Sequence, residues 1–509
     1  MEKSIYQIIC DHISDGVLPA GFSLPDENED KSLIRWAPGA LDGAFFYHAY
    51  HGGLDAAGTK QMAHALKTAA AGSYKEADEL FAEFTREHNA INVVDSMQQY
   101  ILDHAKRLDA GNIFHAGLYL VLHSAHIECV KIGLELLELF EITDENVREI
   151  ICRLALYPEF SLYAVWNMRK WDDGNPYIFE LAKKVHGWGR IHAVENLDPE
   201  TEEIRHWLLI EGTINDITND YSALTCWQKS DAEAVLFGNP TPEEYKGLSV
   251  LIEGLISEGP VPGISRIEGA ERILLRFLEI TPNYDLTISE YEAILSVLYW
   301  ADEDNKPVPA VAAECEKILH SPSCTAVVME SVKDGNGLSL ADELHLPFHE
   351  DLFNVMKRDF DRNYHHLHYL MDDSDFAGKT MDLFRERLPL AEMSNDPIED
   401  PGYDARYTKY DQLHAILQEL IEKPLAGTDF IAAGLRSPLS RNRYWALEDL
   451  KSWVQEKDLP LADLSPELYA VVRDLQPKEI SEECLNSIDQ LLSGQTQFDD
   501  NDEEEHHGR

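Results

Sequence analysis

The chain has 509 residues, of which 44% are hydrophobic, so it is long enough to bury one large core or several smaller ones. Its 43 Lys and Arg residues are outnumbered by 92 Asp and Glu residues, which gives a formal net charge of −49. A charge of this sign opposes binding to the phosphates of nucleic acids and to anionic lipids, so we exclude nucleic acid as a general partner.

The sequence predicts neither a signal peptide nor a membrane span. Residues 1–16 carry acidic side chains, and their apolar run is too short for the core of a signal peptide. No stretch approaches the roughly 18 consecutive apolar residues that a transmembrane helix needs. The 7 cysteines are scattered and include no CxxC pair, which argues against a disulfide framework. We therefore expect a cytoplasmic protein with reduced, mostly buried cysteines.

Residues 1–52 contain prolines, glycines and charged runs without a clear helical period, and we predict that this N-terminal segment is irregular. Over residues 53–393, apolar residues recur at i, i+3, i+4 and i+7, which predicts an array of helical repeats. The first predicted helices span residues 55–71, 74–88, 90–108 and 113–140. Residues 394–403 hold two prolines and few apolar side chains and form a predicted joint, followed by C-terminal helical repeats over residues 404–493. Residues 494–509 are acidic and almost free of apolar side chains, so we predict a disordered tail.

Helix boundaries are clearest in one block in the first half of the chain. Thr143 or Asp144 is predicted to cap a helix, and Pro158 to open the next one. Residues 175–176 and 199–202 each combine Pro with polar residues and predict two further helix starts. Helices of about 12–18 residues, separated in this way, match the units of helical-repeat proteins.

A pattern of the form basic-x-x-Ala-x-x-x-Leu occurs twice, at Arg190, Ala193 and Leu197 and again at Arg443, Ala446 and Leu450. The spacing of three and then four keeps Ala and Leu on one helical face, with a small residue where a neighbouring helix approaches closely. We therefore predict an all-α fold and, within that class, a HEAT-like α-solenoid. Because the repeat period is irregular, the alternative is an irregular multi-helix α-α bundle.

One set of residues has the spacing of a metal site. Asp361, His365, His368 and Asp372 lie at i, i+4, i+7 and i+11, which would place two carboxylates and two imidazoles on one face of a helix. These ligand types suit Zn or non-haem Fe, with further ligands supplied by another helix. The alternative is that this stripe is the solvated flank of an apolar helix face.

Two other patterns have both a functional and a structural interpretation. His115, His123 and His126 include an HxxH spacing that binds metals in some proteins, but we favour buried structural histidines. Residues 187–193 (GWGRIHA) match the dinucleotide fingerprint GxGxxx(G/A), but no strand is predicted before them. We therefore favour a glycine turn between two helices. No serine-hydrolase, P-loop or zincin motif occurs, so catalytic and cofactor-binding residues stay unassigned.

Three segments rich in aromatic residues or glycine carry a family resemblance: residues 34–43 (IRWAPGALDG), 187–195 (GWGRIHAVE) and 221–226 (YSALTC). Through them, most of the chain resembles a bacterial family whose members carry the name limonene hydroxylase. The resemblance implies NAD(P)H-dependent monooxygenation of limonene to carveol and perillyl alcohol. Such chemistry needs a haem, non-haem iron or flavin that activates dioxygen. If iron is used, the predicted stripe of two Asp and two His residues would supply its ligands.

The alternative function is a non-catalytic, HEAT-like protein-binding scaffold. Solenoids mostly bind other molecules along an extended curved surface, and this chain would present an acidic one. In that case the expected partner is a protein with basic chemistry rather than limonene.

Overall fold

The computed structural model describes residues 3–25, 36–48, 54–259, 261–303, 307–398 and 405–498. Within these ranges every regular element is a helix, apart from an isolated β-bridge between Ser14 and Val17. The predicted all-α class is therefore confirmed. Among the described helices, none combines the length and the apolar character needed to cross a bilayer.

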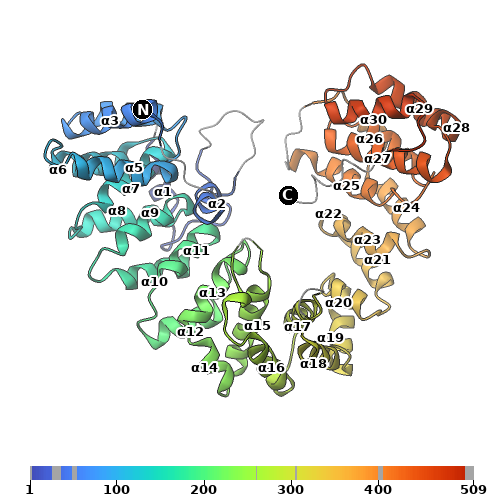
Figure 1. The fold of residues 1–509 in the computed structure, drawn as a ribbon, viewed down its shortest axis with the longest axis horizontal. Helices are drawn as coiled ribbons and strands as arrows, with labels where there is room; N and C mark the ends of the chain where they lie inside the picture. Colours follow the sequence, from blue (N-terminus) through green and yellow to red (C-terminus); the bar gives the residue numbers. More distant parts are fainter. Residues whose placement is uncertain are drawn as a thin grey trace. The chain divides into compact units, whose positions relative to one another are not determined.

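The chain forms two compact units, with the boundary between Leu319 and His320 (Figure 1). The α-helices of the first unit are α1 (Ile5–His12), α2 (Ala40–His48), α3 (Ala56–Ala70), α4 (Tyr74–Phe84), α5 (Ala90–Asp103), α6 (Ala110–His123), α7 (Ile127–Glu138), α8 (Glu145–Ala155), α9 (Pro158–Met168), α10 (Gly174–Lys184), α11 (Gly187–Asn196), α12 (Glu202–Ile210), α13 (Asp220–Lys229), α14 (Ala232–Phe237), α15 (Pro242–Ile256), α16 (Ala270–Ile280), α17 (Ile288–Ala301) and α18 (Pro309–Leu319). Those of the second unit are α19 (Pro322–Ser331), α20 (Leu338–Glu343), α21 (His349–Arg358), α22 (Phe360–Asn363), α23 (Leu367–Met371), α24 (Ala377–Arg387), α25 (Thr408–Gln418), α26 (Thr428–Leu435), α27 (Ser440–Lys457), α28 (Leu461–Leu464), α29 (Pro466–Leu475) and α30 (Glu482–Leu492).

The helices of the first unit pack in chain order. α6 packs against α7, α8 against α9 and α10 against α11, so neighbours in sequence form pairs. Each pair also contacts the next, because α7 packs against α9, α9 against α11, α11 against α13, α13 against α15 and α15 against α17. Stacked helix pairs bury one continuous core in this way. The arrangement fits the solenoid interpretation, and because the helices differ in length it also fits the irregular multi-helix alternative.

Several helix starts follow the sequence signals. α8 begins directly after Asp144, whose side chain accepts a hydrogen bond from the backbone N–H of Asn146. Pro158 is the first residue of α9. Thr201 caps α12 by accepting a hydrogen bond from the N–H of Ile204 at 3.2 Å. These starts were predictable because each depends on one or two adjacent residues.

The N-terminal segment was predicted to be irregular, but it contains α1 and α2. α1 starts at a capping box in which the side chains of Ser4 and Gln7 accept hydrogen bonds from each other's backbone N–H groups. α2 contains Gly43, a residue that weakens an isolated helix. A Cβ atom added at Gly43 would lie 2.2 Å from Cε3 of Trp188, so the glycine permits close packing on the indole. Packing against a distant part of the chain therefore outweighs the low helix propensity of Gly43. Residues 26–35 lie outside the described ranges.

The single helix predicted over residues 113–140 is wrong, because two helices, α6 and α7, occupy this range. The chain turns at Ser124, whose carbonyl oxygen accepts a hydrogen bond from the N–H of Ile5 at 3.0 Å. The hydroxyl of Ser124 accepts a second one from the N–H of His126 at 3.2 Å. The break is thus stabilised by α1, which is distant in sequence.

The described part of the predicted joint lies in the second unit. The N–H of Asn395 donates to the carbonyl oxygen of Arg436, and that of Ile398 to Pro438, each at 3.0 Å. Residues 399–403 of the joint and 499–509 of the predicted disordered tail lie outside the described ranges. Flexibility of the joint and disorder of the tail stay predictions.

Candidate functional site

A cavity of about 860 Å³ lies in the first unit. Residues 214–220 of the loop between α12 and α13 form one wall. The other walls come from residues 253–257 at the end of α15 and residues 296–303 at the end of α17. A cavity of this volume matches the range of ligand pockets in proteins.

The lining of this cavity is acidic. Asp216, Asp220, Glu253 and Glu303 contribute carboxylates, and no basic residue occurs among the described residues that line it. The C-terminal ends of α15 and α17 add the partial negative charge of their helix dipoles. Burial, and then the nearby charge of Glu292, raises the pKa of Glu253 above its ordinary value. The cavity therefore favours a cation over an anion.

Two aromatic side chains, Tyr299 and Trp300, also line the cavity. Tyr299 is 51% exposed, so much of its surface is accessible to a partner. The faces of aromatic rings attract cations that approach to within about 6 Å of the ring centre. Carboxylates and aromatic rings together can bind both the charged end and the apolar stem of a basic side chain.

The loop on one wall is fixed by Asn215. Its side-chain N–H groups donate to two carbonyl oxygens of the same loop at 3.1 and 2.9 Å. Its side-chain oxygen accepts from the N–H groups of Ile217 and Thr218 at 2.8 and 3.0 Å. The N–H of Gly187 joins the loop to α11 by donating to the carbonyl oxygen of Asn215 at 2.7 Å. The acidic wall is thus held in place before any ligand binds.

Asp220 is the most buried carboxylate of the cavity, at 7% exposure, and is the first residue of α13. Its Oδ1 atom accepts hydrogen bonds from the hydroxyl of Thr218 and from the N–H of Tyr221, the latter at 3.1 Å. Its Oδ2 atom has no hydrogen-bond donor among the described residues. A Cβ atom added at Gly259 would lie 3.5 Å from Oδ2, an ordinary van der Waals distance, so the backbone of Gly259 lies close to this oxygen.

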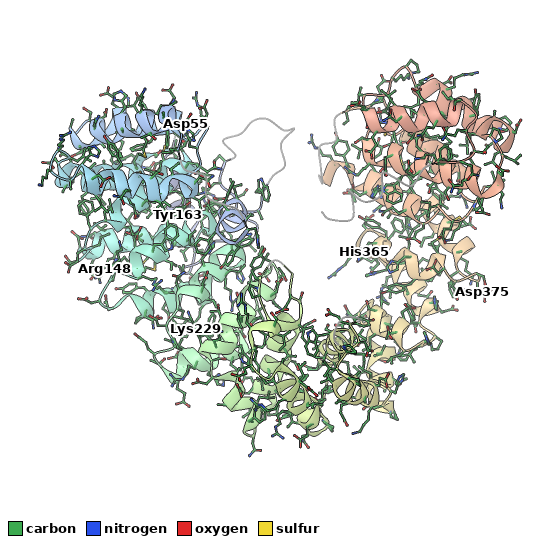
Figure 2. The ribbon with its side chains drawn as sticks, in the orientation of Figure 1. Asp55, Arg148, Tyr163, Lys229, His365 and Asp375 are labelled. Atoms are coloured by element: carbon green, nitrogen blue, oxygen red, sulfur yellow. The ribbon has the colours of Figure 1, made fainter. Side chains whose placement is uncertain are left out.

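A second polar cluster is buried among α2, α7 and α9 of the same unit. Nζ of Lys131 lies 2.8 Å from Asp42, 2.7 Å from Glu128 and 2.7 Å from Glu159, and the lysine side chain is 2% exposed. The ring of Tyr163, which is labelled in Figure 2, has its centre 5.9 Å from the same nitrogen. An ammonium group has three N–H donors, and three carboxylates surround this one. The geometry is that of a structural ion cluster.

The same carboxylates hold other segments in place. The second oxygen of Glu128 accepts from the N–H of Ala90 at 2.6 Å, and that of Glu159 from the N–H of Gly39 at 2.8 Å. Glu135, one turn further along α7, is buried, and its carboxyl oxygens have no hydrogen-bond partner among the described residues. Burial raises the pKa of Glu135 well above its ordinary value, so the fold favours the protonated form of this carboxyl group.

The segments that carry the family resemblance lie together in the fold, except for residues 34 and 35, which are outside the described ranges. Ala40, Trp188 and Ile191 form a buried cluster, and Tyr47 and Tyr221 pack against it. The ring centres of Trp188 and Tyr221 are 4.8 Å apart. These residues join α2 to α11 and α13, so the segments have a packing role.

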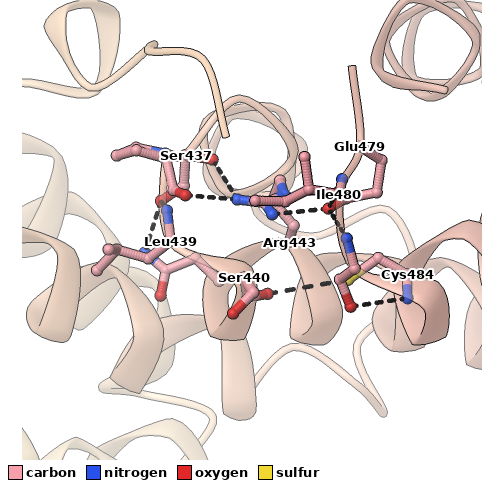
Figure 3. A network of polar contacts seen from close by, with 10 residues as sticks. Ser437, Leu439, Ser440, Arg443, Glu479, Ile480 and Cys484 are labelled. Carbon is pink, nitrogen blue, oxygen red and sulfur yellow. Dashed lines mark hydrogen bonds and ion pairs between the residues drawn. The ribbon is translucent and has the colours of Figure 1, made fainter. Parts of the chain in front are cut away.

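The second unit contains a buried ion pair between α27 and the segment before α30 (Figure 3). Two nitrogens of Arg443 donate to the two carboxylate oxygens of Glu479 at 2.6 and 2.7 Å, and both side chains are fully buried. A third nitrogen of Arg443 donates to the carbonyl oxygens of Ser437 and Pro438 at 3.0 and 2.6 Å. Burial is the largest single effect and acts to raise the pKa of Glu479, but the hydrogen bonds and charge of Arg443, together with hydrogen bonds from the N–H groups of Ser481 and Ile480, outweigh it, and the pKa is lowered.

Asp449, also in α27, is buried without a hydrogen-bond partner among the described residues. Burial, and then the neighbouring charge of Glu448, raises the pKa of Asp449 to about 9 from an ordinary value of 3.8. A carboxyl group whose pKa is higher in the folded state takes up a proton on folding. Its contribution to stability is therefore lost as the pH rises from about 4 towards 9.

We expect Asp449→Asn to remove this pH dependence, because the amide has the same shape and does not ionise. Relative to the variant, the wild type should lose up to about 1.4 kcal/mol per pH unit between pH 5 and 8. Tm values measured by calorimetry at several pH values will test this, with Asp463→Asn as the exposed control. A constant Tm difference between Asp449→Asn and the wild type over this range would contradict the prediction.

The four predicted metal ligands do not share one helix, so the helical stripe is a wrong prediction. Asp361 lies in α22, His365 in a 3₁₀ turn (Tyr364–His366), and His368 in α23, after which Asp372 follows. All four side chains are exposed, and His365 is labelled in Figure 2. The change of helix type between residues 363 and 367 destroys the spacing on which the stripe depended.

Two of these residues already have cationic or amide partners. Asp361 accepts hydrogen bonds from Lys409 at 3.1 Å and Gln412 at 2.7 Å. Asp372 lies 3.8 Å from Nζ of Lys423. Within the described part of the chain, no group of three or more His, Cys, Asp or Glu residues is arranged to hold a metal ion. The arrangement therefore gives no support to metal ligation at the stripe.

The two remaining sequence patterns have different outcomes. His115, His123 and His126 are exposed, so the prediction of buried structural histidines is wrong. Residues 187–193 lie in α11, which follows the helix α10 and no strand. Gly187 has φ of +57°, which is the conformation of a glycine turn between two helices.

Sequence reasoning missed every carboxylate of the cavity and the whole Lys131 cluster. Asp and Glu are common in this chain, so single acidic residues gave no signal. The cavity carboxylates come from positions as distant as Asp216 and Glu303, which only the packing of α13, α15 and α17 brings together. A weak local signal was present in residues 213–220 (TINDITND), whose composition is typical of a loop with side-chain-to-backbone hydrogen bonds.

Comparison of the chain with models of protein families finds no match, and neither the curated proteins nor the solved structures searched contain a significant match. A functional assignment therefore depends on the geometry of the chain itself.

Proposed function

We propose that this chain is a helical scaffold that binds a basic protein partner, with the acidic cavity of the first unit receiving positively charged side chains. The observation that carries the proposal is the lining of the cavity, which combines four carboxylates with two aromatic side chains. The net charge of −49 supports it, because a strongly negative protein attracts a positive partner over a distance and accelerates encounter.

The fixed loop at the cavity also supports a binding function. A wall held by the hydrogen bonds of Asn215 loses little conformational freedom when a ligand binds. A bound cation gains favourable Coulomb energy from the carboxylates that line the cavity. A basic side chain therefore gains Coulomb energy both from direct contact with the carboxylates and from the net negative charge of the rest of the chain.

The experiment is a binding titration of the full chain with fluorescently labelled hexalysine, followed by anisotropy. We expect binding that weakens with salt, because exposed charges are screened within about 8–10 Å at moderate ionic strength. The double variant Glu253→Gln/Glu303→Gln should weaken binding about tenfold, the effect of losing two partly exposed ionic contacts.

The matched control is the double variant Asp95→Asn/Glu316→Gln. It changes the net charge by the same amount, at exposed positions on α5 and α18 outside the cavity lining. If both double variants weaken binding equally, hexalysine responds to net charge alone and the cavity is not the site. Absence of binding to the wild type would also contradict the proposed function.

The oxygenase function implied by the family resemblance stays a prediction. Its test is the metal and flavin content of freshly purified protein, together with limonene turnover in the presence of NADH and oxygen. Stoichiometric iron or flavin with formation of carveol or perillyl alcohol would establish that function and would contradict a purely binding role.

A further inference from the structure

We infer that the cavity selects a lysine side chain over an arginine side chain, because Asp220 presents one carboxylate oxygen to the ligand. This inference rests on the proposed function and names the group that the cavity receives. It makes Asp220 the residue that determines specificity in the cavity.

The two oxygens of Asp220 differ in what already binds them. Oδ1 accepts from the hydroxyl of Thr218 and the N–H of Tyr221, two donors that belong to the same turn of chain. A carboxylate oxygen commonly accepts two hydrogen bonds, so Oδ1 is saturated. Oδ2 has no donor among the described residues, although Asp220 is only 7% exposed. One oxygen is therefore left for a ligand.

The two basic side chains use a carboxylate differently. A guanidinium group is planar and binds most strongly when two parallel N–H groups meet both carboxylate oxygens. An ammonium group is a compact point charge that is satisfied by single contacts to several acceptors. With Oδ1 occupied, Asp220 cannot form the paired contact that favours arginine, but it can accept one N–H from lysine.

The surroundings supply the further acceptors that an ammonium group needs. Glu253 lines the same cavity, where α15 and α17 also end with the negative poles of their helix dipoles. Tyr299 and Trp300 offer ring surfaces for the four-carbon stem of a lysine side chain. Asp220 and Glu253 lie on different walls of the cavity, and separate single acceptors suit an ammonium group better than a flat guanidinium group.

The test compares two peptides of equal length and charge, one with lysine and one with arginine alternating with glycine, by calorimetry with the full chain. We expect the lysine peptide to bind roughly fivefold more tightly. Asp220→Asn replaces the free oxygen or its neighbour by an N–H donor. It should weaken lysine binding about tenfold, the effect of losing one charge-assisted hydrogen bond, and remove the preference.

Thr218→Val is the sharper variant, because it leaves Asp220 charged and frees one acceptor position on Oδ1. The paired contact with a guanidinium group then becomes available, so the preference should shift towards the arginine peptide. Thr218→Ser keeps the hydroxyl donor and should keep the lysine preference. Circular dichroism and thermal melting of each variant establish that the fold is retained.

The outcomes separate this inference from the proposed function. Equal affinity of the wild type for both peptides overturns the lysine selectivity and leaves the binding function standing. A lysine preference that persists in both Asp220→Asn and Thr218→Val overturns the role of Asp220. Failure of both peptides to bind the wild type overturns the proposed function and this inference together.

Discussion

Replacement of Arg443 by methionine is expected to lower the free energy of unfolding of the second unit by about 3–5 kcal/mol, the cost of leaving one member of a buried ion pair without its partner. Glu479 would remain fully buried without its partner, and the carbonyl oxygen of Ser437 would lose the hydrogen bond from Arg443, whereas that of Pro438 would keep its bond from the N–H of Ile398. Urea unfolding of the full chain, followed by tryptophan fluorescence, measures the effect. Trp453 is a buried reporter in the same helix.

The matched control for this prediction is Arg385→Met in the same unit. Arg385 also binds a carboxylate through two nitrogens, at 2.7 and 3.0 Å from Asp429, but both side chains are partly exposed. Loss of the Arg385 side chain should lower the free energy of unfolding by less than about 1.5 kcal/mol, because solvent screens this ion pair and replaces its hydrogen bonds. Arg443→Lys should fall between the two methionine variants. Equal costs for the two methionine variants would show that burial does not decide the strength of these pairs.

Replacement of Lys131 by methionine is the second change with a large expected effect. The variant leaves Asp42, Glu128 and Glu159 buried around an uncharged side chain, and we expect the first unit to lose at least about 3–5 kcal/mol at pH 8. In the wild type, burial already raises the pKa of Asp42 to about 7. Without the ammonium group, the carboxyl groups of the cluster must take up protons to remain buried.

The pH dependence of Lys131→Met follows from that proton uptake. A carboxyl group with a raised pKa in the folded state stabilises the fold increasingly as the pH falls, so the variant should recover part of its loss at pH 5. Calorimetric Tm values at pH 5 and pH 8 measure this recovery. Lys317→Met, at an exposed position of α18, is the control and should change Tm little at either pH. A loss for Lys131→Met that is the same at both pH values would contradict the prediction.

The helices that the sequence predicted well are those whose ends depend on adjacent residues. Asp144, Pro158 and Thr201 each act on the backbone within three residues, and α8, α9 and α12 begin where these signals place them. The elements that were missed depend on distant partners. α2 is stabilised by the close packing of Gly43 on the indole of Trp188. The break between α6 and α7 is stabilised by the hydrogen bond from the N–H of Ile5 to Ser124.

The candidate site was less predictable than the fold for the same reason. The stripe from Asp361 to Asp372 looked like a site because its spacing was read as one helix, and a 3₁₀ turn at residues 364–366 separates its members. Asp220 and Glu253 had no such pattern, and their relation depends on how α13 and α15 pack. Spacing along a chain indicates a site only when the local structure is known.

The position of α2 has a consequence for the order in which the first unit folds. The partners that hold this helix lie further along the chain, at Lys131, Glu159, Trp188 and Tyr221. At a synthesis rate of about 5–20 residues per second, roughly 10–35 s separate the appearance of His48 from that of Tyr221. Until Trp188 and Tyr221 are synthesised, the aromatic face of α2 lacks the rings on which Tyr47 packs in the folded unit. Complete docking of α2 therefore has to await these residues and is among the late steps by which the unit closes.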